Sequence, residues 1–128
     1  MKESNATDQI VERLIAWGCD IPGALPRFLN NRDFYCRLLA EVPEEGSFAK
    51  LGTCLAAGDA KAAFDEAHAL KGVLGNMGLT PMYGEVCAIV EPLRGGTLAG
   101  TREHYDRLME YKARLISILQ PEDESGHL

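Results

Sequence analysis

Apolar residues recur every three or four positions along most of the chain, the spacing that places them on one face of an α-helix. The sustained alternation of apolar and polar residues that is typical of strands is not found, so the sequence predicts no strands. The apolar positions fall into segments near 10–15, 34–42, 48–55, 63–77, 86–90 and 105–119. We therefore expect an all-α fold, an antiparallel four-helix bundle of up-down-up-down topology with additional short N-terminal helices.

The segment at 63–77 has clear boundary signals. Asp59 is a suitable N-cap for a helix that runs to about Met77. The pair Thr80-Pro81 predicts the start of the next helix, as a capping residue followed by proline at the first helical position. The chain between these two helices is therefore expected to be a short turn.

Length and charge restrict the class of protein. A chain of 128 residues suits one domain, which we expect at 7–119, between a flexible N-terminus at 1–6 and a flexible acidic tail at 120–128. A net charge of −6 without a Lys/Arg cluster argues against nucleic-acid binding. No apolar stretch approaches the roughly 18 to 20 residues needed to cross a bilayer, and the N-terminus lacks a signal-peptide core. We expect a cytoplasmic monomer with no membrane partner.

Neither a metal site nor a disulfide is predicted. His104 and His127 lack the H-E-x-x-H type of spacing that zinc ligands show. No C-x-x-C pair occurs, so we expect reduced, buried thiols. The cysteines all lie in or beside apolar segments: Cys19, Cys36, Cys54 and Cys87.

A single histidine stands out on the segment at 63–77. At about 100° per residue, His68 lies roughly 140° from the mean direction of the apolar stripe and therefore faces outward. Side chains on a helix lean toward its N-terminus, so the residue that would cover His68 is at position 72, which is glycine. The residue that would cover the next turn, Gly75, is also glycine.

These glycines require an explanation, because each weakens a helix interior by about 1 kcal/mol relative to alanine. We interpret them as giving a partner access to His68. A buried histidine would lie on the opposite face, and a merely solvated histidine would not account for two glycines beside it. Lys71 follows one turn later and can reach a group attached to the imidazole. A phosphoryl group adds about two negative charges that such a lysine would stabilise.

The pattern His68-x-x-Lys71-Gly72, with Gly78 ten positions after the histidine, resembles the signature of the histidine-containing phosphotransfer (HPt) domain. The similarity extends over residues 7–119 and is most specific at 67–78. It implies a four-helix bundle whose exposed histidine relays phosphoryl groups in a two-component phosphorelay. His68 would be the phosphoacceptor and Lys71 would stabilise the phosphoryl group.

The resemblance also implies partners and further roles. Gly72 would admit the active site of a receiver domain, and Gly75 and Gly78 would support close approach and the turn out of the helix. The expected partners are response-regulator receiver domains and a sensor histidine kinase, and Mg²⁺ would belong to the receiver. No nucleotide-binding motif is present. The chain is therefore expected to be a phosphoryl carrier without cofactors rather than an enzyme by itself.

The sequence departs from the family at one position. Some members hold the imidazole with a glutamine from the next helix, and the aligned position here is Val90. Either the orienting hydrogen bond is missing or a neighbour such as Glu85 supplies it. Phe64 and Leu79 are candidates for an apolar docking rim near His68, although both could instead flank the core.

Two other functions are compatible with the same residues. The bundle could be a non-catalytic interaction module that binds and modulates a receiver or kinase without carrying phosphate. It could also be a small enzyme with His68 as general base, but an outward histidine between glycines indicates no substrate cleft. The presence of both His68 and Lys71 favours the carrier, because docking alone requires neither.

Overall fold

The computed structural model describes residues 6–120, and every element in that range is helical. The all-α prediction is therefore confirmed for the described residues. The expected flexible segments, 1–6 and 120–128, lie almost entirely outside the described residues. Of their residues, the structure describes Ala6, which begins the first helix, and Gln120, which follows the last helix. In chain order the elements are α1 (Ala6–Trp17), α2 (Ile21–Ala24), η1 (Leu25–Phe28), α3 (Arg32–Leu39), η2 (Val42–Glu44), α4 (Ser47–Ala57), α5 (Ala60–Asn76), α6 (Thr80–Arg94) and α7 (Thr101–Leu119).

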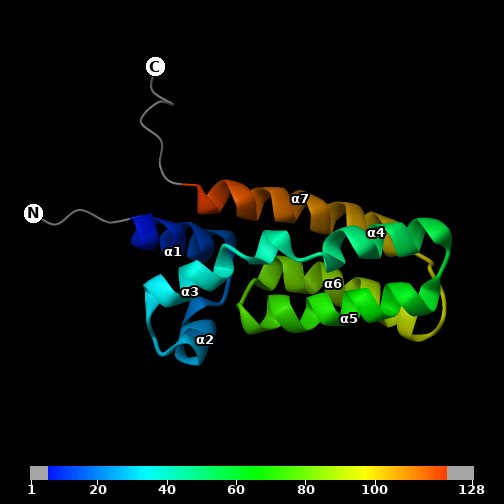
Figure 1. The fold of residues 1–128 in the computed structure, drawn as a ribbon, viewed down its shortest axis with the longest axis horizontal. Coiled ribbons are helices and arrows are strands. Elements are labelled where there is room, and N and C mark those ends of the chain that lie inside the picture. The colour runs from blue at the N-terminus through cyan, green and yellow to red at the C-terminus, as the bar shows by residue number, and fades with distance from the viewer. Residues whose placement is uncertain (1–5, 121–128) are drawn as a thin grey trace, which may run out of the picture.

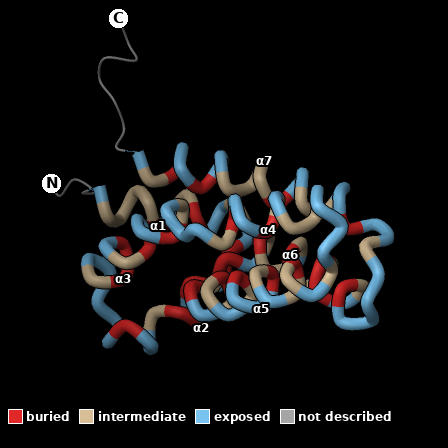
Figure 2. Tube along the Cα trace, turned by 45° about the vertical axis from the view of Figure 1, so that its right-hand side comes forward, coloured by how far each residue is buried: buried red, intermediate tan, exposed pale blue. Residues whose placement is uncertain are grey.

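Figure 1 shows α4, α5, α6 and α7 side by side along the long axis of the molecule. Helix α5 packs between α4 and α6, and α7 contacts both α6 and α4. The short elements α1, α2 and α3 gather at one end, where α1 contacts α3 and α7. In Figure 2 the buried positions of the long helices face one another and the exposed positions face outward.

The core is built from the apolar stripes of these helices. The α5 stripe is fully buried at Ala63, Ala67, Leu70 and Leu74. It meets residues of α6 that are equally inaccessible, such as Val86. Burial of apolar side chains at about 25 cal/mol per Å² is the main force that holds helices of this size together.

The start of α5 follows the predicted signal. The Asp59 side chain accepts a hydrogen bond from the Ala62 backbone N–H at 3.1 Å, which caps the helix as expected. The start of α6 differs by one residue, because Leu79 occupies the N-cap position and Thr80 is already helical. The Thr80 hydroxyl instead donates to the carbonyl oxygen of Gly78 at 3.3 Å.

The end of α5 is fixed by a Schellman turn. The backbone N–H of Leu79 donates to the Leu74 carbonyl, and that of Gly78 donates to the Gly75 carbonyl. Gly78 takes a left-handed conformation with φ of 72°, which this turn requires. A Cβ at Gly78 would also lie 2.5 Å from the carbonyl oxygen of Asp20, so only glycine fits.

Residues from the N-terminal elements hold the same end of α5. The Arg27 guanidinium donates to the carbonyl of Asn76 at 2.8 Å, and the Tyr35 hydroxyl donates to that of Met77 at 2.7 Å. The backbone N–H of Asp20 donates to the Gly78 carbonyl at 2.9 Å. These bonds satisfy carbonyls that a helix end leaves without intrahelical partners.

The cysteines are free thiols, with Cys19 and Cys36 buried and Cys54 and Cys87 half-buried. Burial raises the pKa of Cys19 and of Cys36 to about 11 each. Within residues 6–120, no helix is both long and apolar enough to span a membrane.

Candidate functional site

His68 lies on the exposed face of α5, while its neighbours Ala67 and Leu70 are fully buried. The predicted outward direction of the imidazole is therefore confirmed. Helix α5 buries its apolar stripe in the core and carries the imidazole on its opposite face. The packing of the stripe therefore fixes the position of His68. Such a ring is open to a second protein.

An aromatic ring lies against the imidazole. The centroids of Phe64 and His68 are 5.5 Å apart, and their planes are inclined by 30°. The Arg94 guanidinium from α6 lies over the Phe64 ring, with Cζ 5.3 Å from its centroid. Phe64 is half-buried, so it shares in the packing while leaving part of its ring exposed beside His68.

His68 opens onto a surface hollow of about 310 Å³. Four residues complete the lining: Lys71, Gly72, Gly75 and Tyr83. Among the described residues, no carboxylate lies within 4.0 Å of the Lys71 ammonium, whereas Lys61 nearby pairs with Asp65 at 3.7 Å. The Lys71 charge is therefore available to an anionic group in the hollow.

The glycines expected to give access to His68 differ in their surroundings. A Cβ at Gly72 would meet nothing within 4 Å, so this position is open to solvent. A Cβ at Gly75 would lie 3.0 Å from Cε1 of Tyr83, so Gly75 makes room for a side chain of the same molecule. Gly78 packs against Asp20 and serves the turn. The space beside His68 is therefore open at Gly72, the turn expected at Gly78 is present, and Gly75 lines the hollow while also making room for Tyr83.

Leu79 was expected on the docking rim, and this prediction is wrong. Its exposed fraction is 0%. The Schellman turn explains the difference, because it directs the residue after the left-handed glycine back toward the last turn of the helix. Leu79 therefore joins Leu74, also 0% exposed, in the core.

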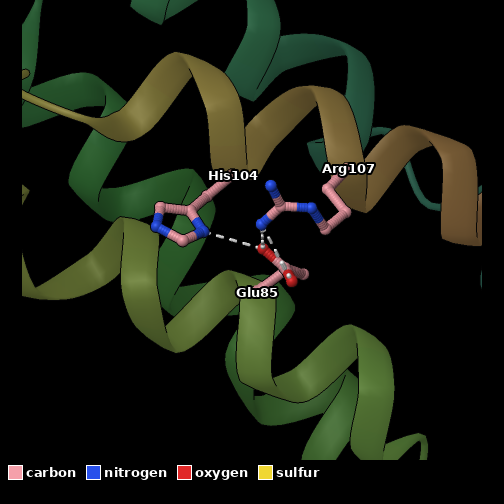
Figure 3. A network of polar contacts seen from close by, with 3 residues as sticks. All are labelled: Glu85, His104 and Arg107. Atoms are coloured by element: carbon pink, nitrogen blue, oxygen red, sulfur yellow. Dashed lines mark hydrogen bonds and ion pairs between the residues drawn. The ribbon is translucent and has the colours of Figure 1, made fainter.

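The imidazole is oriented neither from position 90, which aligns with the family's glutamine, nor by Glu85, the substitute suggested from the sequence. Val90 is 0% exposed in the core. The Glu85 carboxylate is engaged with α7, accepting from Nδ1 of His104 at 2.8 Å and from the Arg107 guanidinium at 3.3 Å, as Figure 3 shows. Within residues 6–120, the ring of His68 makes no hydrogen bond, and its contact with Phe64 is the one ring interaction that fixes it.

Tyr83 and Arg94 are site residues that sequence reasoning missed. Both come from α6 and reach α5 across the helix interface, a relation that periodicity along one helix does not reveal. Gly75, interpreted from the sequence as giving a partner access to His68, was the available signal, since a helix-interior glycine indicates that another group lies close to the backbone. A hydrogen bond with the Cys87 thiol raises the pKa of Tyr83 above its ordinary value.

No group of three or more potential metal ligands occurs among the described residues. The site is therefore a surface imidazole beside an ammonium and a phenol, with an open backbone position next to it. This arrangement can present a nucleophilic nitrogen to an incoming protein and can stabilise an anion attached to that nitrogen.

A family model, that of the Hpt domain, matches residues 33–120. The chain belongs to the Hpt domain family. Its resemblance to this family, seen in the sequence around His68, is therefore confirmed. Comparison with curated proteins and with solved structures gives no match.

Hpt domains are phosphocarrier modules with a phosphotransfer role in phosphorelays, and they interact with kinases and response regulators. The matched region contains α4 to α7 whole and nearly all of α3. It therefore includes His68 and every residue that lines its hollow.

Proposed function

We propose that His68 of this Hpt domain accepts a phosphoryl group and exchanges it with an aspartate of a response-regulator receiver domain, after initial supply by a sensor histidine kinase. The observation that carries the proposal is the exposed imidazole of α5, which shares a hollow with Lys71 and borders the open position of Gly72. In this proposal, Mg²⁺ and the acidic residues that bind it belong to the receiver.

The transfer requires a neutral imidazole. The lone pair of Nε2 attacks the phosphorus of the receiver's aspartyl phosphate, forming an N–P bond while the O–P bond breaks and the aspartate leaves as carboxylate. The proton stays on Nδ1, so the product is a phosphorylated imidazolium, which is a good leaving group in the reverse transfer. No net proton uptake is needed in either direction.

Lys71 has an electrostatic role in this scheme. The phosphoryl group brings about two negative charges to the surface of α5. The ammonium, one helical turn from His68 and without a carboxylate partner among the described residues, lowers the energy of that charged state. Arg94 and Lys61 carry further positive charge nearby, but each is partly neutralised, by Glu91 and Asp65 respectively.

We also infer that α4, α5, α6 and α7 form the antiparallel, up-down-up-down four-helix bundle expected of the family. The supporting observation is that each of these helices contacts two of the others. The connections between them are short, from Gly58–Asp59 to the six residues 95–100, and short connections favour antiparallel neighbours.

The decisive experiment is incubation of the full chain with phosphorylated receiver domains, followed by detection of phosphohistidine at neutral pH. We expect acid-labile, alkali-stable phosphate on the wild-type chain and none on His68→Gln. His104→Gln is the matched control: His104 lies on α7, where it is hydrogen-bonded to Glu85 of α6, and its replacement should leave transfer intact. Phosphate retained by His68→Gln would refute the proposal.

The same experiment separates the carrier from a docking module. Binding of a receiver that survives His68→Ala, with no phosphohistidine on the wild-type chain, would support the module instead. Lys71→Ala should slow transfer while leaving the melting temperature unchanged within about 1 °C, because a half-exposed lysine contributes little to stability.

A further inference from the structure

Tyr83 lines the same hollow as His68 and Lys71, yet it comes from the neighbouring helix. Its side chain is half-exposed, so its ring borders the opening. Of the residues that line this hollow, Lys71 and Tyr83 are the two whose side chains can donate hydrogen bonds to a group on the imidazole. Besides Lys71, helix α5 presents only backbone to the hollow around His68, at Gly72 and Gly75.

The backbone of α5 is adapted to this tyrosine. A Cβ at position 75 would lie 3.0 Å from Cε1 and 3.3 Å from Cδ1 of Tyr83, tighter than ordinary van der Waals contact. Gly75 has no positive φ, so its conformation does not require glycine. The reason for glycine at this position is therefore the space that the Tyr83 ring occupies against α5.

The hydroxyl of Tyr83 is suited to donate. Its hydrogen bond with Cys87 raises its pKa, as expected where the phenol O–H is the donor to the sulfur. Sulfur is a weak acceptor, so a negatively charged phosphoryl oxygen competes favourably for the same O–H. Cys87 lies one turn after Tyr83 on α6.

We propose that Tyr83 is a phosphoryl-binding residue of this site, a directional donor from α6 that complements the charge of Lys71. This inference rests on the proposed function, because it needs a phosphoryl group on His68. The site lacks the glutamine that orients the imidazole in some family members, because Val90 lies in the core and Glu85 is bound to α7. Tyr83 would supply a different interaction from α6, a hydrogen bond to the phosphoryl group instead of the imidazole.

The test needs no protein partner. The full chain is phosphorylated with phosphoramidate, which transfers its phosphoryl group to the histidine nitrogen and releases ammonia, and the product is followed by ³¹P NMR. Tyr83→Phe keeps the ring and removes only the hydroxyl. We expect its phosphohistidine to hydrolyse about three- to tenfold faster than that of the wild type, the effect of one hydrogen bond.

A second readout distinguishes binding from packing. Donation to the phosphoryl oxygens stabilises the dianion, so titration of the ³¹P shift should give a higher phosphoryl pKa in Tyr83→Phe than in wild type. Tyr105→Phe is the matched control. The Tyr105 hydroxyl on α7 donates to the Phe48 carbonyl on α4, so its loss should change neither value. Gly75→Ala displaces the ring and should shift both values in the direction of Tyr83→Phe.

The outcomes separate the two proposals. Phosphorylation that persists in His68→Gln would overturn the assignment of the phosphoacceptor. Phosphohistidine at His68 with the same lifetime and the same phosphoryl pKa in Tyr83→Phe as in wild type would overturn only the role of Tyr83.

Discussion

Replacing Gly72 by alanine should stabilise the protein while reducing its activity. Gly72 lies inside α5, is exposed, and has free space where a Cβ would be placed. The substitution therefore gains the helix propensity of alanine, about 0.8–1 kcal/mol, without a steric penalty. With an unfolding entropy of about 2.1 cal/mol/K per residue, a domain of this size should melt about 4 °C higher.

The same substitution at two other glycines of this region provides the comparison of melting temperatures. Gly75→Ala gains the same propensity but places a Cβ 3.0 Å from Tyr83, so its melting temperature should rise less than that of Gly72→Ala. Gly78→Ala should melt lower than wild type, since its φ of 72° and the nearby Asp20 carbonyl exclude a side chain. Thermal unfolding followed by circular dichroism measures all three.

A larger side chain at position 72 tests whether the open space there gives a receiver access to His68. Gly72→Leu should also be at least as stable as wild type, but it should slow phosphoryl transfer from a receiver at least tenfold by filling the open position beside His68. Phosphorylation by phosphoramidate, a small donor, should remain within about twofold of wild type. A lower melting temperature for Gly72→Ala would refute the propensity reasoning, and undiminished receiver transfer in Gly72→Leu would refute the access interpretation.

Three further predictions concern the core, the rim and pH. Leu79→Ala should lower the free energy of unfolding by about 2–5 kcal/mol in denaturant titrations. A much smaller effect would contradict the burial of this side chain in the core. Phe64→Ser should weaken receiver binding, measured by calorimetry, more than it lowers thermal stability; the opposite ranking would assign Phe64 to the core. Burial raises the pKa of Cys19 and Cys36 from 9.0 to about 11, so the folded state keeps these protons longer than the unfolded state. Stability should therefore be unaffected by these thiols below pH 9 and fall as the pH rises toward 11, a decline that Cys19→Ala/Cys36→Ala should reduce; an equal decline in that variant would contradict the assignment.

The features that follow from one helix at a time were predictable from the sequence. The stripe of α5 and its Asp59 cap follow from 3.6-residue periodicity and from local hydrogen bonding, and both agree with the structure. The outward direction of His68 follows from the same geometry. These features depend on residues within a few positions of one another.

The features that depend on distant residues were not predictable in this way. Tyr83 reaches the site from another helix, and its relation to Gly75 is a contact between elements. Leu79 was a rim candidate because it is close to His68 in the chain, but the left-handed Gly78 that ends α5 turns it into the core. Glu85 was a reasonable neighbour by position, but α7 supplies its partners.

The hydrogen bonds at the C-terminal end of α5 come partly from residues that precede the family match. The family match starts at residue 33, yet Arg27 and Asp20 lie before it and bind the carbonyls of Asn76 and Gly78. A fragment trimmed to the matched region would retain His68 and the residues that line its hollow, but it would lose these bonds to the end of α5. The region that the family model matches is therefore shorter than the stretch of chain that holds α5 in place, and the N-terminal elements belong to that longer stretch.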